Sequence, residues 1–134
     1  MVEQKSENLL TRKAILEAGD YTLRKVAVPE WGGAVYVKTL TGAEKDSFEQ
    51  EISFSEEERE EAKKAGKKCM VDNFRARLLV RCLCDADGNK LFDYDDVAVL
   101  GAKSAKALER CFEAAGELNA LSKKDLEKLE KNSD

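Results

Sequence analysis

The segment YTLRKVAVPEWGGAVYVKTL, residues 21 to 40, constrains the fold of this chain more than any other stretch. Valine alternates with other residues on both sides of its PEWGG centre, at Val26 and Val28 before it and at Val35 and Val37 after it. Alternation with a period of two around a link rich in proline and glycine is typical of a β-hairpin. The type of turn stays open, because the link is five residues long. We therefore predict two antiparallel strands near the N-terminus.

Most of the remaining chain has the periodicity of helices. The most regular stretch is residues 104 to 120, where one helical face carries Leu108, Cys111, Phe112, Ala115 and Leu118. Residues 70 to 84 contain a similar stripe, formed by Val71, Phe74, Leu78 and Cys82. Shorter helices are expected at residues 8 to 18 and after SKKD, residues 122 to 125.

Two capping sequences mark the start of further helices. Thr41 is followed three residues later by Glu44, and Ser55 by Glu58, which is the spacing of a capping box. The first of these helices should run to about Ile52. The second begins a stretch, residues 56 to 68, with five acidic and five basic residues and no large apolar side chain. We expect this stretch to be a solvated helix or a mobile linker.

Together these patterns predict an α+β fold. A chain of 134 residues has the length of one domain, and 43% hydrophobic residues are enough to bury a core. The expected architecture is an N-terminal β-hairpin packed against a bundle of about five mostly short helices.

The composition argues against several classes of function. The chain contains no histidine, so it lacks the commonest general base and every Ser-His or Cys-His arrangement. Its formal net charge of −4 argues against nucleic acid as a partner. No apolar run approaches the roughly 18 residues of a membrane span, and the N-terminus has no signal-peptide core. We therefore predict no enzyme, no cofactor, no nucleic acid and no membrane.

Four cysteines raise the question of a metal site. Cys82 and Cys84 form a C-x-C pair, and Cys69 and Cys111 could in principle complete a four-thiolate zinc site. Neither of the latter two has a partner at the usual spacing. We interpret all four as buried, reduced thiols and predict no metal.

The sequence DADGNKLFDYDD, residues 85 to 96, approaches the rhythm of an EF-hand calcium loop. An EF-hand needs glycine at position 6 and glutamate at position 12, where this chain has Lys90 and Asp96. Turn and capping chemistry accounts for the same residues. Asp87-Gly88 is a turn dipeptide, and Asp93 can cap the helix that follows. We interpret the loop as structural.

Several segments resemble a known protein family. VAVPEWGGAVYVKTLTGAEKDSFE (26 to 49) and NFRARLLVRCLCDADGNKLFDYDDVAVLGAKSAKALERCFEAAGELNALS (73 to 122), with the charged tail behind them, are similar to phage tail assembly chaperones of long-tailed, siphovirus-type phages and prophages. Residues 55 to 68 find no counterpart. We interpret them as a charged variable insertion in a single domain, 1 to 134, that ends in a frayed tail at residues 130 to 134.

The resemblance implies a non-enzymatic role. Members of this family bind the tape measure protein, a very long helical protein that sets tail length. They keep it soluble until tail tube subunits polymerise around it, and they are absent from the mature virion. The implied location is the host bacterial cytoplasm, and the tail tube protein and a second copy of the chain are further partners to consider. The alternative is a small structural or tail completion protein that remains in the virion.

Many relatives are also made in two lengths, the longer one by ribosomal frameshifting near the stop codon. Glu130-Lys131-Asn132 can be encoded as GAA AAA AAC, which contains the slippery heptamer A AAA AAC.

The candidate partner-binding residues are Trp31, Tyr36, Arg75, Arg77 and Arg81. Trp31 lies in a turn, where it can be an interface hot spot or a lid that folds back onto the core. Tyr36 belongs to the same hairpin. The three arginines recur at helical spacing, and they can meet an acidic partner or form a solvated face.

Overall fold

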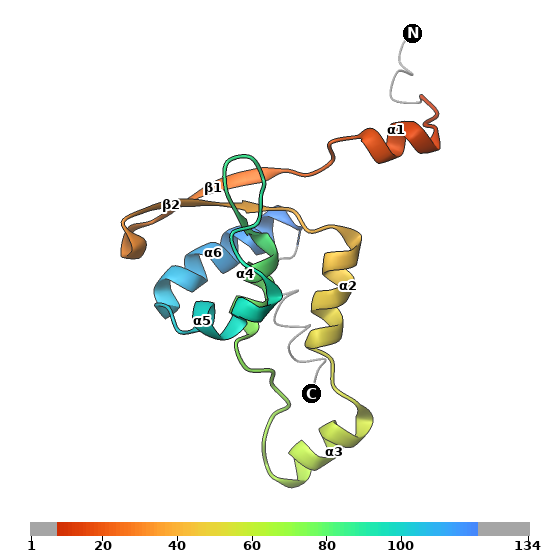
Figure 1. Cartoon of the computed structure of the whole chain (residues 1–134). Helices are drawn as coiled ribbons and strands as arrows, with labels where there is room; N and C mark the ends of the chain where they lie inside the picture. The colour runs from red at the N-terminus through yellow and green to blue at the C-terminus, as the bar shows by residue number, and fades with distance from the viewer. Residues whose placement is uncertain (1–7, 121–134) are drawn as a thin grey trace.

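The computed structural model describes residues 8 to 120 and has an α+β architecture, as predicted (Figure 1). A small antiparallel sheet lies against α4 and α6, and α2 flanks them (Figure 1). In chain order the elements are α1 (Arg12–Glu17), β1 (Leu23–Val28), the 3-10 turn η2 (Pro29–Trp31), β2 (Gly33–Lys38), α2 (Gly42–Glu51), α3 (Glu56–Lys64), α4 (Phe74–Cys82), β3 (Leu83–Cys84), the 3-10 turn η3 (Tyr94–Asp96), α5 (Val97–Gly101) and α6 (Ala105–Leu118).

The predicted hairpin is confirmed. β1 and β2 pair antiparallel, from Leu23 opposite Lys38 to Val28 opposite Gly33. The PEWGG link forms one 3-10 turn that ends at Gly32, whose φ of 75° lies in the left-handed region that favours glycine. Val28 is completely buried on the face that packs against the helices.

The structure adds a short third strand that the sequence pattern did not indicate. The helical stripe predicted for residues 70 to 84 becomes α4, which ends at Cys82. Leu83 and Cys84 then pair with Val37 and Tyr36 of β2. Both residues are buried, and this pairing gives backbone groups of β3 hydrogen-bond partners on β2.

Both predicted capping boxes are present. The Glu44 backbone N–H donates to Thr41 Oγ1 over 3.1 Å, and the Thr41 N–H donates to Glu44 Oε1 over 2.9 Å. The Ser55 and Glu58 pair has the same geometry and begins α3. α2 buries Phe48, but α3 has no buried residue. Of the two alternatives, a solvated helix or a mobile linker, residues 56 to 64 therefore form the solvated helix.

The core lies where α4 and α6 pack against the sheet. α4 contributes Leu78, Leu79 and Val80, none of which exposes any surface. The predicted inner face of α6 is buried as well, at Leu108, Cys111, Phe112 and Ala115. Each large aliphatic buried in this way stabilises the fold by roughly 1.5–3 kcal/mol. Three phenylalanine rings join α2, α4 and α6, because Phe48 and Phe112 each lie 5.7 Å from Phe74, centroid to centroid.

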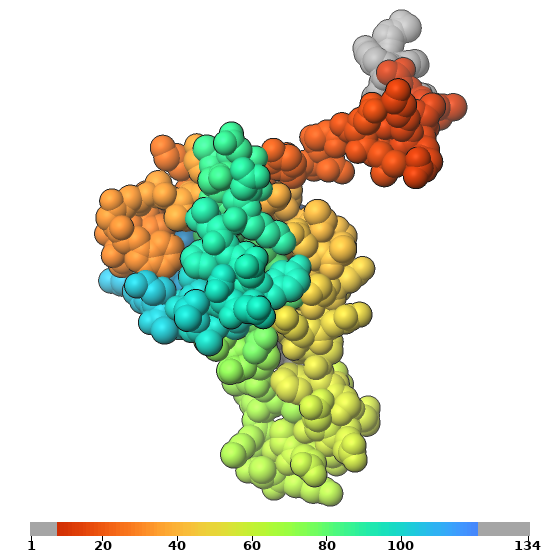
Figure 2. Space-filling view, in the orientation of Figure 1, coloured from red at the N-terminus to blue at the C-terminus, as the bar shows by residue number. Residues whose placement is uncertain are grey.

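Two helices project from this body at opposite ends (Figure 2). α3 lies at one end, and α1 lies at the other. α1 begins at Arg12, later than predicted, because Thr11 caps it by accepting from the Ala14 N–H over 3.2 Å. Four large aliphatics in and before α1 are 55–96% exposed: Leu9, Leu10, Ile15 and Leu16.

Within residues 8 to 120, no helix has the length and apolar character needed to cross a membrane. The helix predicted after residue 122 and the tail at residues 130 to 134 lie outside the described residues.

Candidate functional site

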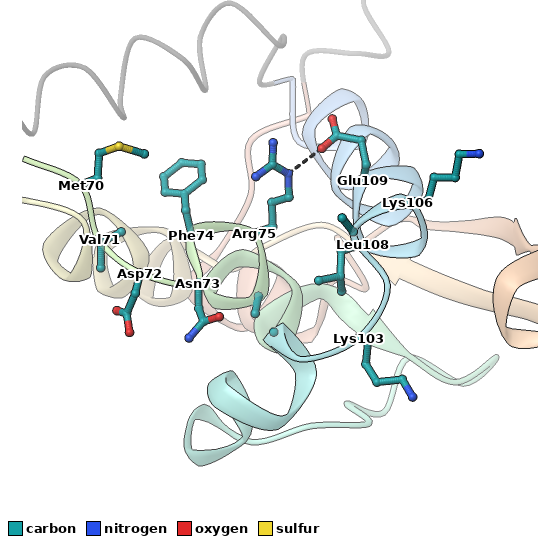
Figure 3. Close-up of a pocket in the computed structure, with 13 residues that line it drawn as sticks. Met70, Val71, Asp72, Asn73, Phe74, Arg75, Lys103, Lys106, Leu108 and Glu109 are labelled. Carbon is teal, nitrogen blue, oxygen red and sulfur yellow. Dashed lines mark hydrogen bonds and ion pairs between the residues drawn. The ribbon is translucent and has the colours of Figure 1, made fainter. Parts of the chain in front are cut away.

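An apolar groove of about 830 Å³ opens between the N-terminal turns of α4 and α6 (Figure 3). Val71, Phe74 and Leu108 form its apolar lining, together with Met70. Phe74 and Leu108 are anchored in the core, whereas Met70 is 58% exposed at the edge. This groove can therefore accept apolar side chains from another protein without disturbing the packing beneath it.

The groove depends on a close approach between α4 and α5. Asn73 precedes α4 with a φ of 55°, and its side chain lies directly over Gly101 at the end of α5. A Cβ at position 101 would lie 2.1 Å from Asn73 Oδ1, so any other residue there would force the Asn73 side chain to move. This contact places the turn between α5 and α6 beside the start of α4.

An ion pair spans the groove. Arg75 on α4 reaches Glu109 on α6, with Nε and Oε1 2.5 Å apart (Figure 3). The guanidinium also lies 5.5 Å from the ring centroid of Phe112. Both charged side chains are partly exposed, so the pair adds little stability and contributes chiefly to the shape of the groove.

A second recess, of about 580 Å³, lies beside the hairpin turn. Its lining is formed by Glu30, Trp31, Phe92, Val99, Leu100 and Lys103. Trp31 is half-buried and packs against the core with part of its ring. Its Nε1 is buried and has no hydrogen-bond acceptor among the described residues.

The hairpin turn is tied to α6 by a two-point ion pair. Arg110 Nε and Nη2 donate to the two carboxylate oxygens of Glu30 over 2.8 and 2.9 Å. The hydrogen bond from Arg110 holds the pKa of Glu30 below its ordinary value. This pair fixes the turn that carries Trp31 against the rest of the molecule.

The other predicted contact residues lie apart from these recesses. Tyr36 is half-buried on β2, opposite Lys25 and Cys84. Arg77 is held between Asp72 and Glu51, at 2.9 and 3.2 Å. Of the five candidates, Arg75 lines the groove and Trp31 lines the second recess.

The expectation that Arg81 belongs to a solvated face is wrong. Arg81 exposes no surface at all. Its Nη2 donates to Ser47 Oγ over 2.7 Å and lies 3.2 Å from Glu51 Oε2, while the guanidinium stacks 4.5 Å from the Tyr94 ring centroid. Residues of α2 and η3 enclose this side of α4, which a helical period cannot reveal. Arg81 is therefore a core residue and not a surface contact.

The four cysteines are free and buried, as predicted. Burial raises the pKa of Cys82 to about 12 and that of Cys111 to about 11, so these thiols are poor nucleophiles. Within residues 8 to 120, no cluster of acidic or cysteine side chains has the arrangement of a metal site.

The loop at residues 85 to 96 has the predicted turn and cap. Asp85 Oδ1 accepts from the backbone N–H groups of Asp87 and Asn89, each over 2.9 Å. Hydrogen bonds from Asn89 and Asp87 hold the pKa of Asp85 below its ordinary value. The Asp93 N–H donates to Asp96 Oδ2 over 2.8 Å at the start of η3. These carboxylates therefore serve the local backbone.

Sequence reasoning missed most of the groove. Phe74 and Leu108 were assigned to helical stripes, and nothing local in the sequence places residues 70 to 76 beside residues 103 to 109. The conspicuous signal was the single tryptophan in a turn, and it does mark the second recess.

Comparison with known proteins identifies the family of this chain. The family model described as phage tail assembly chaperone matches residues 10 to 132. The solved structure of the bacteriophage HK97 tail assembly chaperone is similar in fold, with a TM-score of 0.53 and 18% identity over 79% of this chain and 90% of that one. No curated protein matches the chain. Because the family match covers nearly the whole sequence, the chain belongs to the phage tail assembly chaperone family.

Proposed function

We propose that this protein binds the tape measure protein of a long-tailed phage, keeps it soluble and helps tail tube subunits polymerise around it. The observation that carries the proposal is the apolar groove between α4 and α6, in a chain of this family. A long helical protein exposes apolar stripes that aggregate unless they are covered. A groove that receives one face of a helix is a common way to cover them.

The exposed aliphatics around α1 support the same role. They offer apolar surface beyond the groove, at the opposite end of the molecule from α3. The role is binding without catalysis, in the host bacterial cytoplasm. The tail tube protein and a second copy of this chain are further proposed partners, and the protein leaves before the virion matures.

Co-expression with overlapping fragments of the tape measure protein from the same phage tests the proposal. At least one fragment should move from the insoluble to the soluble fraction and co-purify with the chaperone. Met70→Asp, at the edge of the groove, should lose this capture by tenfold or more. Leu91→Asp is the matched control, because Leu91 is a similarly exposed aliphatic that lines neither recess.

Failure of the wild-type protein to solubilise any fragment would contradict the proposal. Purified virions separate it from the alternative of a tail completion protein. Mass spectrometry should find the chaperone in infected cells and not in mature particles. Its presence there in stoichiometric amounts would favour the alternative.

A longer product made by frameshifting belongs to this proposal. The codons for Glu130-Lys131-Asn132, outside the described residues, should contain A AAA AAC, followed by an open −1 frame. The longer form would add a second contact to the tape measure protein and raise avidity. An early stop codon in that frame excludes the longer product and leaves the chaperone function untouched.

A further inference from the structure

The groove and the Trp31 recess meet at one residue, Lys103, which lines both. Lys103 lies in the turn between α5 and α6, directly before Ser104, the residue that caps α6. The two recesses therefore lie on either side of one turn. They form a single surface with apolar parts at both ends and a cation between them.

This surface carries two lysines that form no ion pair within the described residues, although, beside the hydrogen bond from Arg110, the charge of Lys106 also helps to lower the pKa of Glu30. Most charged side chains near it are paired, as in Arg75–Glu109 and Arg110–Glu30. Lys103 and Lys106 have no ion-pair partner within residues 8 to 120 and extend outward beside the groove (Figure 3). The chain as a whole has a net charge of −4, whereas the two recesses are lined by three basic and three acidic side chains, and all three acids are paired with arginines.

The position of these lysines works against the helix that bears them. The N-terminus of a helix has a partial positive charge, which favours acidic side chains in the first turn and disfavours basic ones. α3 follows this rule, with Glu56, Glu57 and Glu58 in its first turn. α6 has no acidic residue there, and Lys106 occupies the first turn instead. Local helix stability therefore does not explain Lys103 and Lys106.

The apolar parts of the surface are open to a partner at both ends. Met70 is 58% exposed beside the groove, and Val99 is 62% exposed beside Trp31. Trp31 itself has an indole N–H without an acceptor, which is an unfavourable arrangement for a buried donor. A small movement of this ring on binding would allow a partner oxygen to accept from it.

From these observations we infer that the surface binds an amphipathic helix whose apolar ridge is flanked by carboxylates. The apolar side chains enter the two recesses, and the carboxylates meet Lys103 and Lys106. This rests on the proposed function, in which the partner is a long helical protein, and it specifies the acidic character of the segment that binds.

Two synthetic peptides test the inference directly. Both have the same apolar residues at helical spacing, and one carries glutamate and the other lysine at the flanking positions. Binding is followed by the fluorescence of the single tryptophan. The acidic peptide should bind about tenfold more tightly than its basic twin, and the difference should shrink in high salt.

Charge reversal supplies the decisive comparison. Lys103→Glu/Lys106→Glu should invert the preference between the peptides and leave the melting temperature unchanged or higher, since acidic residues suit the start of α6. Lys63→Glu/Lys64→Glu is the matched control, because these lysines lie in the last turn of the solvated helix α3. The control should bind both peptides as the wild type does. Equal binding of the two peptides, or an unchanged preference after reversal at 103 and 106, overturns the inference.

The same variants separate this inference from the proposed function. If Lys103→Glu/Lys106→Glu captures tape measure fragments as well as the wild type does, the inference is overturned while the chaperone function stands. A preference for the acidic peptide, inverted by the reversal, together with no capture of any fragment, supports the surface and contradicts the tape measure protein as its partner.

Discussion

Arg81 and Glu51 form an ion pair in which the arginine is completely buried and the glutamate is partly exposed. The distance from Nη2 to Oε2 is 3.2 Å, and the pair joins α4 to α2. Arg77 reaches the same carboxylate, so Glu51 balances two cations. Arg81 Nε is buried without an acceptor among the described residues. The cost of removing the guanidinium from water is therefore only partly offset by its hydrogen bonds and ion pair.

Removing the carboxylate should therefore cost more than removing both charges. Glu51→Ala should lower the free energy of unfolding by about 2 kcal/mol, because it leaves a buried guanidinium without its counter-ion. Adding Arg81→Met should restore about 1 kcal/mol of that loss, because it removes the unpaired charge and keeps the volume. Urea denaturation of the two single variants and the double variant measures this coupling.

Glu109→Ala is the control for this cycle, because both side chains of its pair with Arg75 are partly exposed. It should cost less than about 1 kcal/mol. A double variant at 51 and 81 that is less stable than Glu51→Ala would contradict this expectation. It would show that the contacts of the guanidinium with Ser47 and Tyr94 stabilise the fold more than its ion pair with Glu51 does.

The pH dependence of stability should include a clear contribution from Glu44. Burial alone would raise the pKa of this carboxyl, but hydrogen bonds from Lys90 and the Thr41 backbone, with the charge of Lys90, hold it below its ordinary value of 4.5. A depressed pKa means that the folded state prefers the ionised form. The stability contributed is therefore complete above about pH 4.5 and is lost as the pH falls through the lower, folded-state pKa.

Glu44→Gln should reveal this directly. The difference in free energy of unfolding between wild type and variant should be largest near neutral pH and should shrink below about pH 4.5. Glu49→Gln serves as the control on the same helix, because Glu49 forms an exposed pair with Lys45. A wild-type advantage over Glu44→Gln that stays constant down to about pH 3 would contradict the assignment.

Local patterns in the sequence were enough to predict the hairpin, both capping boxes and α6. Each of these depends on residues within a few positions of one another, as Thr41 and Glu44 do. β3 was missed because a strand of two residues is too short to show an alternating pattern. Its pairing with β2 also joins residues more than forty positions apart in the chain. Burial of Arg81 was missed for the same reason, since it requires α2 and η3 to enclose α4.

The candidate site was even less accessible to sequence reasoning. The groove joins the start of α4 to the start of α6, and the second recess joins the hairpin turn to α5. Only tertiary contacts, such as that between Asn73 and Gly101, create these surfaces. Trp31 could be singled out because a lone tryptophan in a turn is unusual by itself.

Substitutions of Trp31 should separate its packing from its role in binding. Trp31→Ala should lower stability by about 1–3 kcal/mol, less than the 3–5 kcal/mol of a fully buried aromatic, because the ring is half-buried. Trp31→Phe should stay within about 1 kcal/mol of wild type, since it removes the N–H that lacks an acceptor. Both variants should lose capture of a tape measure fragment, the alanine variant by tenfold or more. A Trp31→Ala protein that is grossly unfolded would identify the ring as a core lid.

Deletion of residues 56 to 66 should leave a folded and active domain. α3 has no buried residue and lies at the far end of the molecule, so its loss exposes little apolar surface. Shortening a loop changes the free energy of unfolding by about 1 kcal/mol or less.

One local effect is expected, because Cys69 Sγ contacts the Glu58 carbonyl at 3.5 Å. Cys69 should react with a thiol reagent in the deletion variant, while Cys82, Cys84 and Cys111 stay protected. Phe48→Ala, which removes a buried ring of α2, is the contrasting variant and should cost about 3–5 kcal/mol. Loss of cooperative unfolding in the deletion, or labelling of the other three thiols, would show that α3 stabilises the body of the domain.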